Sequence, residues 1–414
     1  MGRKTSAGAD ALMQETVSQP ALQGSRSALD SIAFAAFAAS LSTRALDPVL
    51  PVVADEFAVK IATAAGIAAG YMLTFGAVQP LIGPMADLLG KARLMVGCLA
   101  LLALTNILSA FANSLFLLLA VRILAGVAAG GVVPVALGLV SDLVAREQRQ
   151  VAIGRITAGV MIGTFLGASM TGLISDLQGW RGALAVLGIL GLVASAVVAV
   201  GLGPTAFMQP PRADLSAVRK SYGVILANPN ARVCYSAVFI EGCCIFGLFP
   251  FIASFMFDRG QASSSTAGIV IAGFALGGLI YTVTISRVLP KLGVRGAMIA
   301  GAGLVGLQLV AMAFGSDWKL QFVILLLMGW GFSLIHGCLQ VFASDLSVNT
   351  RAVAMSFHVF FYSMGQTVGP IVYGVGLRYL GKFPTLLVSA CIMAVLGLAC
   401  ALLLESPKRG ELKA

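Results

Sequence analysis

The sequence consists mainly of long apolar segments that recur along its whole length, separated by short polar stretches. A membrane-spanning helix needs about 20 mainly apolar residues. Twelve segments of about this length are present, and backbone groups in lipid must find hydrogen bonds within their own segment, so each is predicted to be an α-helix. The predicted spans are 30–53, 63–84, 94–112, 115–139, 152–175, 182–203, 232–256, 265–286, 296–314, 320–343, 353–377 and 383–404.

The composition supports an all-α integral membrane protein. Hydrophobic residues make up 58% of the chain and charged residues only 11%, whereas soluble domains carry about 25% charged residues. The net charge of +10 would suggest nucleic-acid binding in a soluble chain. Here the basic residues follow the predicted topology instead, so we expect no nucleic-acid partner.

The loops predict the orientation of the chain. Nineteen Lys and Arg residues fall on one side of the predicted spans and six on the other, with Arg44 and Arg122 inside spans. Basic loops stay in the cytoplasm, so both termini are expected there. The tails 1–29 and 405–414 are then cytoplasmic, and the first is expected to be disordered. The short loops and Ala-rich composition favour a bacterial inner membrane.

The chain is predicted to contain two related halves. The longest interior loop, 204–231, divides it into six-helix bundles at 30–203 and 232–404. A shift of 202 or 203 residues brings glycines of the first half onto glycines of the second. The matched pairs include Gly90 with Gly293, Gly126 with Gly329, Gly163 with Gly365, Gly167 with Gly369, and Gly179 with Gly381.

The loop after the second predicted span contains Gly83, Asp87, Gly90, Lys91 and Arg93. It resembles the signature loop of the major facilitator superfamily, Gly-x-x-x-Asp-x-x-Gly followed by basic residues. The resemblance covers residues 30–404. It implies two pseudo-symmetric six-helix bundles around a central cavity, alternating access, and a loop that braces the cytoplasmic gate. A turn that only fixes topology is the alternative reading.

Small residues recur at helical spacing in several spans. Arg122, Gly126 and Gly130 share one face of the fourth span and resemble the family's Arg-x-x-x-Gly motif. Gly163, Gly167 and Gly172 in the fifth span resemble the exporters' glycine-proline motif, although Ala168 replaces its proline. The second half has Gly365, Gly369 and Pro370. Small residues also let membrane helices pack closely, so these glycines are read as packing positions.

An acidic residue in the first span is the first candidate for proton coupling. Asp47 precedes Pro48 and Pro51, and this segment resembles the first helix of drug:proton antiporters. Asp47 and Arg122 lie at a similar depth, about 10 Å from the outer helix ends, so they are expected to meet if both line one cavity. Arg44, three residues before Asp47, offers a permanent local pair instead. Arg44 is also a candidate for the substrate cavity.

The second half offers its own candidates. Glu241 lies well inside the seventh span, and intramembrane carboxylates are functional candidates by default. In the tenth span Phe332, His336 and Gln340 share a face, with Trp330 near by. They are predicted to line the substrate cavity, and satisfied packing residues are the alternative.

No cofactor or metal is expected. The Gly-x-Gly-x-x-Gly pattern at 301–306 lies inside a predicted span and lacks the strand that a dinucleotide site requires. The two histidines, His336 and His358, have no Cys or carboxylate at ligand spacing. We therefore expect a transporter and no enzyme.

The function that the resemblance favours is proton-coupled export of small organic or amphipathic molecules by a monomer in the lipid bilayer. Two alternatives remain open. One is an uptake symporter or uniporter for a metabolite. The other is a receptor or assembly factor that no longer transports, although the charges at Asp47, Arg122 and Glu241 argue against it.

Overall fold

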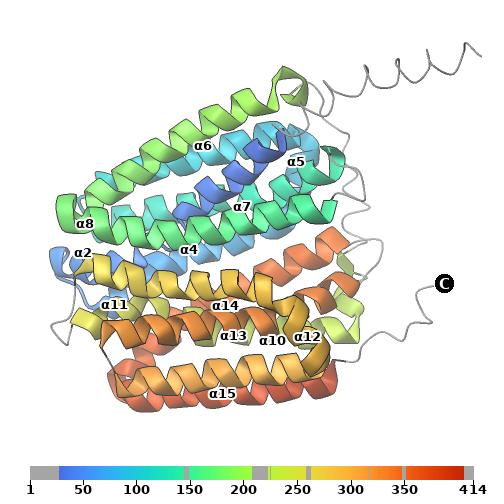
Figure 1. The fold of residues 1–414 in the computed structure, drawn as a ribbon. Coiled ribbons are helices and arrows are strands. Elements are labelled where there is room, and N and C mark those ends of the chain that lie inside the picture. Colours follow the sequence, from blue (N-terminus) through green and yellow to red (C-terminus); the bar gives the residue numbers. More distant parts are fainter. Residues whose placement is uncertain are drawn as a thin grey trace, which may run out of the picture.

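A computed structural model describes residues 28–143, 149–207, 222–223, 225–257, 263–315, 317–346 and 351–404, and every element within them is helical (Figure 1). The predicted tails 1–29 and 405–414 lie almost wholly outside these residues, and the predicted linker 204–231 lies partly outside them. The elements are Ala28–Leu41, η1 (Asp47–Val49), α2 (Leu50–Glu56), α3 (Ile61–Ala64), α4 (Gly66–Ala77), α5 (Gln79–Leu89), α6 (Lys91–Ala110), α7 (Leu115–Leu143), α8 (Arg149–Leu202), η2 (Pro204–Phe207), α10 (Pro229–Glu241), η3 (Gly242–Phe246), α11 (Phe249–Phe257), α12 (Ser264–Phe314), α13 (Trp318–Asp345), α14 (Arg351–Tyr379) and α15 (Lys382–Leu403).

Two of these helices are too long for one membrane crossing. α8 has 54 residues and α12 has 51, which is about 75–80 Å of helix at 1.5 Å per residue. The apolar core of a bilayer is about 30 Å thick. Each helix reverses at a glycine with positive φ, Gly179 in α8 and Gly293 in α12, so each makes two passes.

With these reversals counted, the described residues make the twelve predicted passes. The first pass combines Ala28–Leu41, η1 and α2, and the seventh combines α10, η3 and α11. The helices group into two bundles, one above the other in Figure 1, with blue to green helices in the upper bundle and yellow to red helices in the lower. Many large apolar side chains remain exposed on the outside, among them Phe111, Phe116 and Leu402. This exposure fits a lipid environment.

Four glycine turns explain part of the sequence repeat between the two halves. Gly90, Gly179, Gly293 and Gly381 have φ between 66° and 86° and ψ between 131° and 177°. This backbone region is nearly restricted to glycine. Each glycine ends one helix and starts the next, so two of the matched pairs, Gly90 with Gly293 and Gly179 with Gly381, are required by the same tight reversal.

The two bundles meet mainly along two pairs of helices, and η1 also packs against α11 and α12. α8 packs against α12, and α4 packs against α14. At the first crossing Gly172 lies so close to α12 that an added Cβ would be 2.2 Å from the Ser264 carbonyl oxygen, and a Cβ at Gly268 would be 2.5 Å from the Ala168 carbonyl oxygen. Small residues therefore let the halves approach each other at the end where Asp176 and Ser264 lie.

Candidate functional site

Two passes in corresponding positions of the halves are interrupted near mid-depth. The first pass loses its regular helix between Leu41 and Asp47, and the seventh contains a π-helical turn, η3, directly after Glu241. Pro48 explains the first break, because its ring excludes the carbonyl of Arg44 and it donates no backbone hydrogen bond. Paired interruptions of this kind mark the binding region of membrane transporters, and π-turns are frequent at functional sites.

Arg122 of α7 is held inside the first bundle. Its side chain is 2% exposed. Nη1 donates to Asn106 at 3.0 Å, Nη2 donates to the Ser42 carbonyl at 3.1 Å, and the guanidinium lies 4.6 Å from the centre of the Tyr71 ring. The Ser42 carbonyl belongs to the interrupted part of the first pass, so the break supplies an acceptor for a buried charge. Nε has no hydrogen-bond partner among the described residues.

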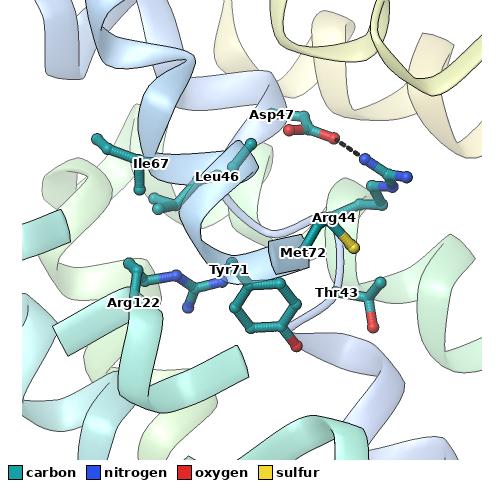
Figure 2. A pocket seen from close by; sticks show the side chains of 9 residues that line it. Thr43, Arg44, Leu46, Asp47, Ile67, Tyr71, Met72 and Arg122 are labelled. Atoms are coloured by element: carbon teal, nitrogen blue, oxygen red, sulfur yellow. Dashed lines mark hydrogen bonds and ion pairs between the residues drawn. The ribbon is translucent and has the colours of Figure 1, made fainter. Parts of the chain in front are cut away.

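Asp47 pairs with Arg44 and not with Arg122. The carboxylate lies 3.5 Å from Nη1 of Arg44, and both side chains are buried. Arg122 lines the same small pocket, together with Tyr71 and Thr43 (Figure 2). The structure therefore contains the local pair, one of the two arrangements that the sequence leaves open.

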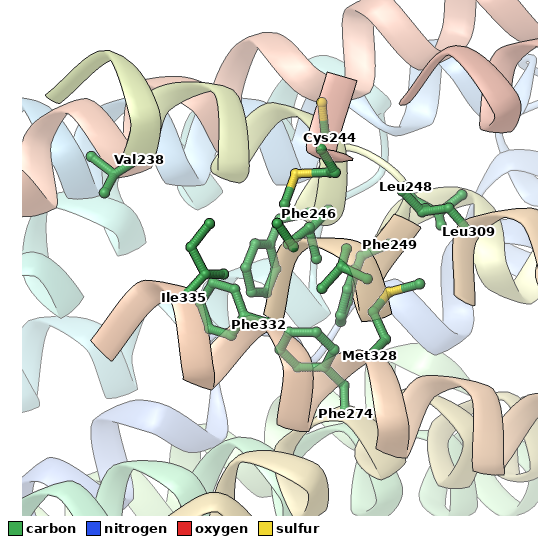
Figure 3. Close-up of a cluster of buried hydrophobic side chains, with 14 of the residues drawn as sticks. Val238, Cys244, Phe246, Leu248, Phe249, Phe274, Leu309, Met328, Phe332 and Ile335 are labelled. Carbon is green, nitrogen blue, oxygen red and sulfur yellow. The ribbon is translucent and has the colours of Figure 1, made fainter. Parts of the chain in front are cut away.

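Arg44 also connects the two halves of the molecule. Its guanidinium lies 4.5 Å from the centre of the Phe246 ring and 4.9 Å from that of Phe249, both in the seventh pass. Nη2 donates to the side-chain oxygen of Gln366 in α14. Phe246 and Phe249 belong to a buried aromatic cluster with Phe274 and Phe332 (Figure 3), so Arg44 rests on the core of the opposite bundle.

Glu241 and His336, which the sequence offers as separate candidates, lie together. Oε2 of Glu241 is 2.7 Å from Nδ1 of His336, and the carboxylate is 0% exposed while the imidazole is 12% exposed. The amide of Gln340 lies 3.2 Å from Nε2 of the same ring, and Phe332 stacks on it with ring centres 4.7 Å apart. Oε1 of Glu241 has no partner within the described part of the chain.

Trp330, predicted to line the same cavity, is directed elsewhere. Its indole nitrogen donates to Thr284 of α12 at 2.9 Å. It stands six residues before His336, which places it on a different face of α13. The structure brings Phe332, His336 and Gln340 together and leaves Trp330 at the contact between α12 and α13.

The signature loop lies where α5 turns into α6. Gly83 and Asp87 are on α5, Gly90 makes the turn, and Lys91 and Arg93 begin α6. Nζ of Lys91 reaches the Gly138 carbonyl of α7 at 3.5 Å, and Arg93 is exposed. The loop is thus joined to the end of the fourth pass.

The glycines predicted to pack helices lie at close crossings. An added Cβ would stand 2.0 to 2.6 Å from the nearest atom of a neighbouring helix at Gly126, Gly130, Gly163, Gly167, Gly172, Gly365 and Gly369. The partners are mostly backbone atoms, which cannot move away locally. Pro370 follows Gly369 inside α14.

Sequence reasoning missed the uncharged polar residues of the site. Asn106 holds Arg122, and Gln366 accepts from Arg44. An amide in an otherwise apolar span was the available signal, because a buried polar group in lipid needs a partner.

The fold and the buried charges define a membrane transporter, and the comparisons with known proteins agree. Residues 32–261 and 234–414 match the Major Facilitator Superfamily. The chain belongs to this family, and it is a transporter and not an enzyme. Its setting is the membrane, and its substrate is a small molecule.

Curated relatives and solved structures are similar to the chain over most of its length. Quinolone resistance protein NorA of Staphylococcus aureus is 24% identical over 336 residues, which is 79% of this chain and 84% of the relative. Uncharacterized MFS-type transporter YybF of Bacillus subtilis is 25% identical over 367 residues, 84% and 88% of the two chains. A bacterial homolog of the human lysosomal transporter Spinster, solved inward-facing and unoccupied, has a TM-score of 0.72 at 15% identity and covers 91% of this chain and 97% of its own.

Proposed function

We propose that the protein is a proton-coupled exporter of small amphipathic organic molecules that works by alternating access. The observation that carries the proposal is the fully buried Glu241 carboxylate, bonded through one oxygen to His336. A buried charge is costly unless it is paired. The proton occupancy of this pair therefore changes the energy of the second bundle.

The pair suits proton exchange because both members can gain and lose a proton. With the proton on the ring, His336 donates to the carboxylate. With the proton on Glu241, the carboxyl donates to Nδ1. The 2.7 Å contact serves either form, so the pair can bind and release a proton without losing its hydrogen bond.

Asp47 and Arg44 provide the link between the halves. Arg44 reaches Phe246, Phe249 and Gln366 in the second bundle while it pairs with Asp47 in the first. The Asp47 carboxylate is the counter-charge that holds Arg44 in this position. We assign Asp47, Arg44 and Arg122 to the coupling between proton binding and the movement of one bundle against the other.

The surroundings favour an amphipathic, ring-containing substrate. Four phenylalanines and Tyr362 form a connected cluster beside Arg44 and His336. Ligand sites commonly combine apolar and aromatic walls with a few polar groups. The relative NorA is a quinolone resistance protein, which supports an exported drug-like substrate of this kind.

The test uses purified protein in liposomes that contain a pH-sensitive dye. Ethidium and a fluoroquinolone are added under an imposed proton gradient, and proton flux and substrate flux are recorded together. Substrate-triggered proton movement that is lost in Glu241→Gln supports the proposal. Uphill transport that survives in Glu241→Gln would remove the carboxylate from the mechanism.

Glu56→Gln is the matched control. Glu56 is a partly exposed carboxylate of α2 bound to Arg181 and Trp180. It lies in the same pass as Asp47 but outside the site. We expect proton-coupled transport of this variant to equal that of the wild type.

The orientation and the domain limits stay predictions. An even number of passes places both termini on one side, and the excess of Lys and Arg assigns that side to the cytoplasm. We likewise propose, from the sequence, that the bundles span residues 30–203 and 232–404 and that the protein is a monomer. Labelling of single cysteines placed at the two termini by an impermeant reagent in intact cells tests the orientation.

A further inference from the structure

We propose that His336 is the proton relay between Glu241 and water, with the exit at Gln340. The inference rests on the proposed function and gives His336 a role beyond lining the cavity. It comes from a continuous line of contacts that leads from a fully buried carboxylate to an exposed amide.

Burial falls step by step along this line. Glu241 is 0% exposed, His336 is 12% exposed, and Gln340 is exposed. The contacts are 2.7 Å from Oε2 of Glu241 to Nδ1 and 3.2 Å from Nε2 to the amide of Gln340. Within the described residues, His336 is the hydrogen-bond partner of the Glu241 carboxylate. The imidazole is therefore the group that can accept a proton from Oε2.

In this relay the two ring nitrogens of His336 have different roles: Nδ1 accepts the proton from Glu241, and Nε2 releases a proton to water. A neutral His336 that carries its proton on Nε2 accepts the Glu241 proton at Nδ1, so that the Oε2–H bond breaks and the Nδ1–H bond forms. The imidazolium then releases the Nε2 proton to water beside Gln340. The ring is left neutral with its proton on Nδ1, and it donates to the Glu241 carboxylate.

Gln340 fits both states of the ring. Its amide presents an NH₂ group to an unprotonated Nε2 and, turned over, an oxygen to a protonated one. Its position one helical turn after His336, on the same face of α13, places it at the exit. The amide of Gln340 therefore forms a hydrogen bond to Nε2 in either state of the ring but does not itself accept or release the proton.

His358 of α14 provides an internal control. It is the second of the two histidines in the chain, its ring centre lies 5.0 Å from that of His336, and it is 1% exposed. Neither of its ring nitrogens has a hydrogen-bond partner in the described structure. It is adjacent to the relay but not joined to it. Tyr362 of α14 also contacts the His336 ring, with centres 4.9 Å apart.

The experiment measures proton release from Glu241 without any substrate. Purified protein receives a rapid pH jump, and infrared difference spectra follow the protonated carboxyl band, which Glu241→Gln assigns. We expect His336→Phe and His336→Gln to slow the loss of this band by about tenfold or more, within the range for a positioned acid–base group. His358→Phe should keep the wild-type rate, and imidazole in solution should restore the rate of His336→Ala.

Each outcome decides a separate question. His336→Gln preserves a hydrogen bond to Glu241 but cannot pass a proton between two ring nitrogens, so a wild-type rate in this variant would overturn the relay. Equal slowing in His358→Phe would overturn the assigned exit. A carboxyl band that does not change between wild type and Glu241→Gln would overturn the proposed function itself, and the relay with it. Thermal unfolding of each variant checks that the fold is retained.

Discussion

The first bundle buries Asp47 beside Arg44, whereas the second buries Glu241 beside His336. The partners differ in one property that matters for function. An arginine keeps its charge under all ordinary conditions, but an imidazole exists in both a neutral and a protonated form. Asp47 thus has a permanent counter-charge, and Glu241 has a partner whose charge is variable.

The surroundings of the two pairs differ in the same sense. Arg44 and Arg122 are tied to several groups in three or more helices, including Gln366, Asn106 and the Ser42 carbonyl. Glu241 has one partner and one free oxygen within the described residues. The comparison supports the proposed division of roles, in which the charges of the first bundle link the two halves and the pair in the second bundle binds and releases the proton.

The largest expected effect is the loss of stability caused by Arg122→Leu in the first bundle. Arg122→Leu leaves Asn106 and the Ser42 carbonyl without their donor inside the bundle. A buried polar group left without its partner costs about 1–3 kcal/mol, and two are left here, so the unfolding temperature should fall strongly. Arg122→Lys should restore little of this stability. An ammonium group cannot reproduce the two hydrogen bonds of the planar guanidinium or its stacking on Tyr71. Thermal unfolding in detergent measures both, and a wild-type midpoint in Arg122→Leu would contradict the comparison.

Glu241→Gln should give the second largest effect. It should reduce the coupling of transport to the proton gradient and leave the stability of the protein nearly unchanged. An amide keeps a hydrogen bond to His336 but carries no exchangeable charge. We expect uphill transport to fall about 100-fold, which corresponds to about 2.7 kcal/mol, with the unfolding temperature nearly unchanged. Exchange of labelled substrate across liposomes at equal pH should persist. Loss of exchange together with uphill transport would show that Glu241 serves substrate binding.

Asp47→Asn is expected to have a smaller effect, about tenfold on uphill transport. Arg44 retains Phe246, Phe249 and Gln366 when its counter-charge is gone, so the link between the halves weakens without breaking. The same transport and exchange measurements apply. A loss as complete as that in Glu241→Gln would make the two pairs equivalent and break the comparison.

Asp176→Asn should have the smallest effect of the four. The carboxylate accepts from the backbone N–H groups of Ser264 and Ser265 at 2.9 and 3.0 Å, so a residue of the first bundle caps α12 of the second. Ser263 caps the same helix locally, which limits the loss to about 1 kcal/mol. The population open at this end should rise about fivefold, as measured by the labelling rate of the buried, nearly isosteric replacement Ser264→Cys. Unchanged labelling would show that the cap does not hold the halves together.

Much of the fold could be predicted because lipid leaves few choices. Segments such as 182–203 and 383–404 hold no charge, and a backbone in lipid has to be helical. The matched spacing of Gly90 and Gly293 also has a strict cause, since both occupy a backbone region that other residues avoid.

The pairing within the site could not be predicted in the same way. Glu241 and His336 are 95 residues apart, and helical spacing gives the face of a residue but not which faces of two distant passes meet. Asp47 was a different case: both of its possible partners were visible in the sequence. The choice of Arg44 follows from the unwound segment before Pro48, which turns Ser42 toward Arg122 and so occupies the second arginine.

The most direct test of the central claim counts protons. Purified protein in weakly buffered detergent solution is mixed with ethidium or a fluoroquinolone, and the pH change is recorded for the wild type, Glu241→Gln and Asp47→Asn. If the variable pair in the second bundle carries the proton, substrate addition releases protons from the wild type and from Asp47→Asn, but none from Glu241→Gln. Wild-type proton release from Glu241→Gln, or its loss only in Asp47→Asn, would place the exchangeable proton in the first bundle and contradict the account.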